Sequence, residues 1–138
     1  MKKDVITITQ NRAISDAAIL MSENSIGCLV VMDKEAPVGI ITERDFVRRV
    51  VAKNLSPSVT KISEVMSKPL ITIDPDLSVR DAARMMIENK IRRLPVVKDD
   101  KLIGIIVVSD FARQLSKKTL TEEILEAMAR YPLEVIPY

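Results

Sequence analysis

The sequence of 138 residues contains the same segment twice. Residues 5–50 align with residues 70–115 without a gap, so each residue corresponds to the one 65 positions later. The identical pairs extend over the whole alignment and include Ile6 and Ile71, Asp16 and Asp81, Met21 and Met86, Gly39 and Gly104, Asp45 and Asp110, and Phe46 and Phe111. A gapless repeat of this length predicts one supersecondary unit used twice, because one copy alone would leave an apolar face uncovered.

The spacing of apolar residues predicts how each copy begins. A short extended segment opens it, at residues 5–8 and 70–73, and an amphipathic helix follows. The apolar positions of this helix are Ile14, Ala17, Ala18 and Met21 in the first copy and Val79, Ala82, Ala83 and Met86 in the second. Ser78 is the expected N-cap of the second of these helices.

Two β-rich runs and a closing helix complete each copy. The runs are residues 28–32 and 38–41 in the first copy, and 94–97 and 102–107 in the second, separated by polar turns. The closing helices carry Phe46, Val47 and Val50 in one copy and Phe111, Ala112 and Leu115 in the other. The order β-α-β-β-α occurs twice, which predicts an α+β fold of two repeats packed sheet to sheet about a pseudo-two-fold axis.

The repeat also gives the expected boundaries. Residues 1–51 form the first repeat, 52–69 a linker with a short helix, 70–117 the second repeat, and 118–138 a C-terminal helix and tail. The C-terminal helix has one apolar face, made by Leu120, Ile124, Ala127, Met128 and Tyr131. This face either packs back on the domain or binds a partner.

Composition argues against catalysis and against a membrane protein. The absence of histidine removes the common nucleophile triads and every histidine-containing zinc site. Enzymes that use only carboxylates stay open as an alternative, but no recognisable catalytic motif supports one, so we expect no enzyme, no metal and no catalytic cofactor. The single Cys28 excludes an intramolecular disulfide. No run of 18 apolar residues and no signal peptide is found, and we expect a cytoplasmic protein.

Several motifs resemble those of a known family. The chain is similar to a tandem pair of CBS domains, also called a Bateman module, over residues 3–117. The resemblance is carried by "VMSKPLITIDPDLSVRDAARMMIENKIRRLPVV", by "GIIVVSDF" and by "GIITERDFVRRVV". It implies a stand-alone two-CBS regulatory unit that binds an adenosine-containing ligand, namely AMP, ADP, ATP or S-adenosylmethionine, in two clefts between the copies.

The resemblance assigns Asp45 and Thr42 to the ribose, and Asp110 to the ribose of the second cleft. A carboxylate can accept hydrogen bonds from both ribose hydroxyls. A structural interpretation stands beside this one, because Thr42-x-x-Asp45 before a helix resembles a capping box. In the second copy Val107 replaces the threonine while Asp110 is kept, which the capping box explains less easily and which predicts that the two clefts differ.

Arg92 and Arg93 begin a strand of the second copy, where the first copy has Gly27 and Cys28. An exposed arginine pair is often only a solvated surface. The resemblance implies instead that these residues reach the phosphates of the nucleotide at Asp45, and the planar guanidinium suits phosphate because it donates paired hydrogen bonds.

The complete predicted sites combine these residues with apolar positions for the adenine, which are equally good core residues. The first site consists of Asp45, Thr42, Ile40, Leu70, Ile71, Arg92, Arg93, Pro95 and Ser109. The second, weaker site consists of Asp110, Ile105, Val5, Ile6, Gly27, Cys28, Val30 and Arg44. Arg44 would partly replace the missing arginine pair there.

The function expected from the sequence is therefore an adenine-nucleotide sensor that changes conformation and acts on a regulated partner protein. A homodimer is the assembly that the resemblance implies. One alternative is an RNA- or DNA-binding protein, since the pI is about 8.7, but a net charge of +2 and 3% aromatic residues argue against it. Another is a docking subunit of a larger enzyme or transporter that binds no ligand.

Overall fold

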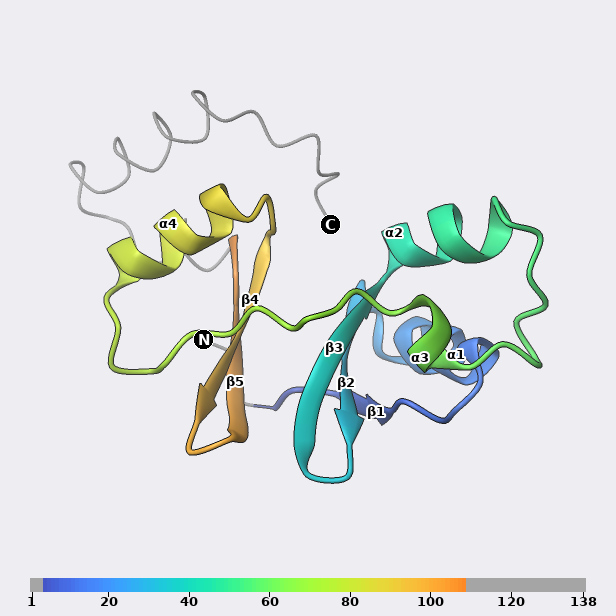
Figure 1. Ribbon diagram of the computed structural model, residues 1–138, viewed down its shortest axis with the longest axis horizontal. Helices are drawn as coiled ribbons and strands as arrows, with labels where there is room; N and C mark the ends of the chain where they lie inside the picture. Colours follow the sequence, from blue (N-terminus) through green and yellow to red (C-terminus); the bar gives the residue numbers. More distant parts are fainter. Residues whose placement is uncertain (1–3, 109–138) are drawn as a thin grey trace. The chain divides into compact units, whose positions relative to one another are not determined.

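The computed structural model describes residues 4–108, which divide into two compact units, one of residues 4–71 and one from residue 72 onward. The first unit contains β1 (Thr7–Thr9), α1 (Ile14–Asn24), β2 (Cys28–Asp33), β3 (Ala36–Thr42), α2 (Glu43–Asp45), a π-helical turn η1 (Phe46–Val51) and α3 (Ile62–Val65). The second contains α4 (Val79–Glu88), β4 (Arg93–Lys98) and β5 (Lys101–Val107). The mixed α+β architecture with two repeats is confirmed (Figure 1).

The two hairpins have the same register. In the first, β2 pairs antiparallel with β3, with Cys28 opposite Thr42; in the second, β4 pairs antiparallel with β5, with Arg93 opposite Val107. Both ladders shift register at the same point, after Val31 in one and after Val96 in the other. The duplication seen in the sequence therefore extends to individual backbone pairs and to the irregularity between them.

The opening segments also correspond. β1 pairs parallel with β2, which places Ile8 beside Val31, and an isolated parallel bridge joins Ile73 to Val96. The amide of Ile73 donates to the carbonyl of Pro95 at 3.0 Å. The extended segment expected at 70–73 is thus reduced to a single bridge, whereas the one expected at 5–8 is a three-residue strand, Thr7–Thr9.

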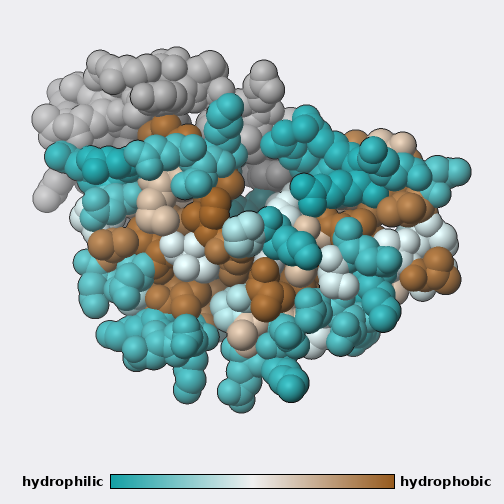
Figure 2. All heavy atoms as spheres, in the orientation of Figure 1, coloured by the Kyte–Doolittle hydropathy of each residue, from teal (hydrophilic) through white to brown (hydrophobic). Residues whose placement is uncertain are grey.

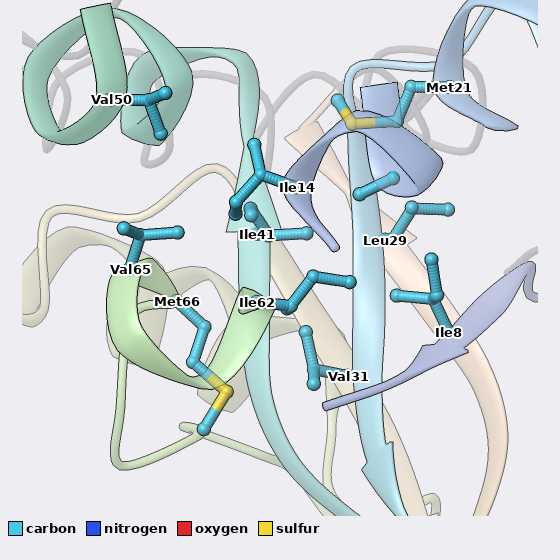
Figure 3. Close-up of a cluster of buried hydrophobic side chains, with 11 residues drawn as sticks. Ile8, Ile14, Met21, Leu29, Val31, Ile41, Val50, Ile62, Val65 and Met66 are labelled. Atoms are coloured by element: carbon cyan, nitrogen blue, oxygen red, sulfur yellow. The ribbon is translucent and has the colours of Figure 1, made fainter. Parts of the chain in front are cut away.

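One face of the β2–β3 hairpin forms a hydrophobic core with α1. Leu29, Val31 and Ile41 alternate with residues of the opposite face, and they pack with Ile14 and Met21 (Figure 3). This alternation follows from the two-residue period of a strand. The other face of the hairpin is left to the residues predicted to bind the ligand.

The first helices agree with the predicted pattern except at one position. Ile14, Ala17 and Met21 are buried, but Ala18 is exposed, so its placement on the apolar face was wrong. The buried stripe of α1 is narrower than that of α4, where the equivalent Ala83 is buried. The N-cap expected at Ser78 is confirmed: its hydroxyl accepts from the Asp81 amide at 3.1 Å.

The helix that follows β3 begins as the three-residue α2 and continues as η1. Of the three apolar residues expected on this closing helix, Val50 is buried and Phe46 packs at the edge of the core, whereas Val47 is exposed. The closing helix of the second repeat, with Phe111, Ala112 and Leu115, lies outside the described residues, as does the segment 118–138.

The segment after this helix belongs to the core of the first unit. Ile62, Val65 and Met66 on and after α3 are buried against the hairpin and α1 (Figure 3). Gly39 allows the close approach, since a Cβ there would lie 2.7 Å from Met66 Sδ and 3.0 Å from the Ser67 carbonyl oxygen. A side chain at position 39 would therefore force the backbone of this segment away from β3.

The capping box of α4 generates a prediction about pH. Hydrogen bonds from Ser78, first from its hydroxyl and then from its amide, lower the pKa of the Asp81 carboxyl below its ordinary value. The box therefore stabilises the fold above the ordinary pKa, and this stabilisation is lost as the pH falls through the lowered one. Replacing Ser78→Ala should raise the pKa of Asp81 and lower the melting temperature by about 2–5 °C at neutral pH, with a smaller difference in acid.

The first repeat offers a matched control. Ala13 occupies the N-cap of α1 with an extended backbone like that of Ser78, and Asp16 stands three residues later. Installing the hydroxyl by Ala13→Ser should raise the melting temperature. An NMR titration of Asp81 and melting curves against pH measure both effects, and an unchanged Asp81 pKa in Ser78→Ala would show that the box is not its cause.

Candidate functional site

Seven of the predicted ligand residues lie on the two hairpins, four on one face of the first and three on one face of the second. Residues directly opposite each other, and those two positions along, share a face of a sheet. In the first unit this places together Cys28, Val30, Ile40 and Thr42, where Cys28 pairs with Thr42 and Val30 with Ile40. In the second it places together Arg93, Pro95, Ile105 and Val107, where Arg93 pairs with Val107 and Pro95 with Ile105.

These two faces carry their polar groups on different strands. At the paired positions, the first unit has cysteine and threonine, and the second has arginine and valine. The hydroxyl of the first hairpin is thus on β3, at Thr42, and the cation of the second is on β4, at Arg93. Val30, Pro95 and Ile105 are buried, while the other apolar and polar members of the two faces are half-buried.

Asp45 ends α2, and its side chain is buried, with 5% of the residue exposed. Thr42 and Asp45 form the capping box that the sequence suggested. The Thr42 amide donates to Asp45 Oδ2 at 3.0 Å, and Thr42 Oγ1 accepts from the Asp45 amide at 3.3 Å. The structural role of this aspartate is therefore present, and any ligand contact must be compatible with it.

The carboxylate of Asp45 also has a partner from a distant part of the chain. Ser67 Oγ donates to it, 3.0 Å from Oδ1 and 3.3 Å from Oδ2. The backbone holds Ser67 in place through two hydrogen bonds with Ile40, one from the Ser67 amide at 2.8 Å and one from the Ile40 amide at 3.1 Å. Asp45 thus joins the start of a helix to the segment that follows α3.

Arg49 is the third residue around this carboxylate. Its Nε lies 3.6 Å from Asp45 Oδ1, one helical turn away, and its Nη1 donates to the carbonyls of Val65 and Met66, both at 3.1 Å. These carbonyls belong to the end of α3, whose last acceptors have no partner within the helix. Figure 2 shows hydrophilic side chains gathered over α2 and η1, and the side chain of Arg49 is half exposed there.

The other predicted residues are placed as follows. Arg44 is half-buried on α2, and Arg92 lies just before β4, where its carbonyl accepts from the Val108 amide at 3.0 Å. The carbonyl of Gly27 accepts from the Glu43 amide at 3.1 Å, which ties the start of β2 to the start of α2. Four apolar members, Val5, Ile6, Leu70 and Ile71, are half-buried. Ser109 and Asp110 lie outside the described residues.

Sequence reasoning missed Ser67 and Arg49. Asp45 ends α2 and Arg49 lies in η1, four residues later. This spacing is a recognisable signal for an ion pair. Ser67 has no such signal, because its contact with Asp45 spans 22 residues and depends on how α3 returns to β3.

Two classes of site are not found among residues 4–108. This part of the chain has no group of three or more histidine, cysteine, aspartate or glutamate side chains placed to hold a metal ion. None of its helices is long and apolar enough to cross a lipid bilayer.

Comparison with known proteins identifies the family. The CBS domain matches residues 1–52 and 62–117. The chain is 35% identical over 120 residues to the CBS domain-containing protein YhcV of Bacillus subtilis, covering 86% of this chain and 85% of that protein.

Solved structures agree with this match. A putative signal-transduction protein with CBS domains from Burkholderia ambifaria has a TM-score of 0.77 and 35% identity, covering 83% of this chain and 84% of that one. A hexameric CBS-CP12 protein from bloom-forming cyanobacteria has a TM-score of 0.74 and 34% identity, covering 94% and 79%. With two matched domains on the two structural repeats, the chain belongs to the CBS-domain family, as a tandem pair of CBS domains.

Proposed function

We propose that this protein is a regulatory sensor of an adenosine-containing ligand and has no catalytic activity of its own. CBS-domain proteins are generally regulatory and ligand-binding, which supports the coarser part of this proposal. The observation that carries the finer part is Asp45, a buried carboxylate at the end of the half-buried hairpin face that includes Thr42 and Ile40. Such a carboxylate suits a vicinal diol, because it accepts two hydrogen bonds at once.

The capping box leaves part of this carboxylate for other donors. Thr42 donates to Oδ2 through its amide and, at 3.3 Å, through its hydroxyl, whereas neither donates to Oδ1. A carboxylate has about four lone-pair sites. The same aspartate can therefore cap α2 and bind a ribose, so the two interpretations of the sequence do not exclude each other.

Phosphate binding is proposed for Arg92 and Arg93 of the second repeat, with Arg44 as the weaker counterpart for the other site. Arg93 occupies the position at which the first repeat has Cys28. Its guanidinium therefore has no counterpart on the equivalent hairpin face of the first repeat. The two sites should accordingly differ in affinity for charged ligands. The apolar pairs Val30 with Ile40 and Pro95 with Ile105 are the side chains proposed to contact an adenine.

Regulation would follow from unequal affinity of the ligand for two conformations, which shifts their populations. We further propose a homodimer. Val47 and Val51, four residues apart on η1, and Leu55 after it are exposed apolar side chains, and self-association would cover them. The regulated partner would be a second protein that recognises one of the two conformations.

Ligand binding is tested by titrating the protein with AMP, ADP, ATP, adenosine and S-adenosylmethionine. At about 100 times the dissociation constant a ligand should add about 2.7 kcal/mol to the free energy of unfolding. For a domain of this size the melting temperature should then rise by about 5–10 °C. If calorimetry detects no heat and melting curves show no shift with any of the five at millimolar concentration, the proposed function is wrong.

Asp45→Asn tests the ribose contact. The variant keeps one acceptor oxygen but loses the charge, so binding should weaken about ten- to a hundredfold, the range for a hydrogen bond to a charged group. It should also melt at a lower temperature, because Asp45 is part of the capping box.

A deoxyribose form of the ligand separates these two roles. In the native protein the 2′-deoxy ligand should bind more weakly than the ribose ligand, and in Asp45→Asn this difference should shrink. A purely structural aspartate would weaken both ligands by the same factor and leave their ratio unchanged.

Arg93→Ala tests the phosphate contact and the inequality of the sites. Calorimetry of the native protein should give one tight and one weak or silent site per chain. The variant should weaken ATP and AMP at the tight site about ten- to a hundredfold, leave adenosine nearly unaffected, and make binding less sensitive to salt. Two identical sites, or equal losses for ATP and adenosine, would contradict the assignment.

A further inference from the structure

The Ser67 hydroxyl donates a hydrogen bond to the Asp45 carboxylate in addition to those from Thr42. Its Oγ lies 3.0 Å from Oδ1 and 3.3 Å from Oδ2, so it sits in front of the carboxylate, close to both oxygens. A vicinal diol that donates to both oxygens of a carboxylate must approach on this same side. The hydroxyl and the diol would therefore compete for one region of space.

The donors around Asp45 differ in how easily they can leave. Thr42 donates through its amide and hydroxyl as part of the capping box, so its departure would expose the start of α2. Arg49 is held by two carbonyls at the end of α3. The Ser67 hydroxyl can leave by rotation about one side-chain bond, while its backbone stays bonded to Ile40.

We propose that the Ser67 hydroxyl is a placeholder on the Asp45 carboxylate, and that ribose binding displaces it. This rests on the proposed function, since it assumes that Asp45 receives the ribose hydroxyls. With no ligand, Ser67 satisfies a carboxylate that would otherwise be buried with too few donors, which is costly. With a ligand, the diol supplies these hydrogen bonds, and the Ser67 side chain turns away.

The exchange makes Ser67 a determinant of affinity. The ligand gains its own hydrogen bonds to Asp45 but must break the one from Ser67. Removing the serine hydroxyl should therefore strengthen the binding of ligands that carry the diol, and it should do nothing for ligands that lack it. A residue that contacts the ligand directly would give the opposite result, because its removal weakens binding.

The experiment compares Ser67→Ala with the native protein by calorimetry, using AMP, ATP and S-adenosylmethionine, which carry the same ribose diol, and 2′,3′-dideoxy-AMP, which lacks it. We expect Ser67→Ala to bind the diol ligands about 3- to 10-fold more tightly and the dideoxy ligand with unchanged affinity. Its melting temperature without ligand should fall by a few degrees, because one hydrogen bond to a buried carboxylate is lost.

Two further variants serve as a control and as a substitute for Ser67→Ala. Ser63→Ala removes a half-buried hydroxyl of α3 for which the structure shows no hydrogen bond, and it should bind all ligands like the native protein. Ser67→Cys keeps nearly the same size with a much weaker donor. It should shift affinity in the same direction as alanine, and it serves in place of Ser67→Ala if that variant does not fold.

The outcomes separate this inference from the proposed function. If the native protein binds the diol ligands and Ser67→Ala binds them equally or more weakly, the placeholder is wrong and the sensor function stands. If Ser67→Ala also tightens the dideoxy ligand by the same factor, the hydroxyl does not compete with the diol and the placeholder is again wrong. If neither protein binds any of the three diol ligands, both proposals fail.

Discussion

The carboxylate of Asp45 joins three segments of the first repeat: the end of β3, the helix that follows it, and the segment after α3. Through Thr42 it fixes the point where β3 becomes a helix, and through Ser67 it fixes the segment that follows α3. Arg49, beside the same carboxylate, satisfies the carbonyls that end α3. A buried charge is tolerated only when it is well hydrogen-bonded. Asp45 therefore needs these donors, and it also holds them in position.

This network depends on a close approach of backbones that only glycine permits. The segment of Met66 and Ser67 runs against Gly39, and the backbone of Ser67 pairs with Ile40. Burial of Ile62, Val65 and Met66 supplies the apolar part of the same contact. The first unit is therefore completed by residues that follow its second helix, and Ser67 is brought to Asp45 by hydrophobic packing rather than by its neighbours in sequence.

The sequence predicted the fold well because the repeat is gapless. A strand period of two shows which residues of one strand share a face, and the offset of 65 carries this from the first copy to the second. The cross-strand pairs Val30 with Ile40 and Pro95 with Ile105 come from the structure, and each joins two residues that the sequence had assigned to different sites. Side-chain exposure was less predictable, as at Ala18 and Val47, because helical periodicity gives the direction of a stripe but not its width. The contact between Ser67 and Asp45 depends on how α3 packs against the hairpin, so no local sequence pattern predicts it.

The aspartates at the starts of helices show what distinguishes a candidate site from a cap. Asp16 keeps its position although Ala13 provides no hydroxyl, and it pairs with Arg12 at the surface. An aspartate retained without a capping partner, the argument applied to Asp110, is therefore also found where no ligand is expected. Asp81 has the same box as Asp45 but is partly exposed. Asp45 differs in being buried and in receiving a hydrogen bond from 22 residues away, so burial and distant donors, rather than the motif, distinguish this candidate from the two caps.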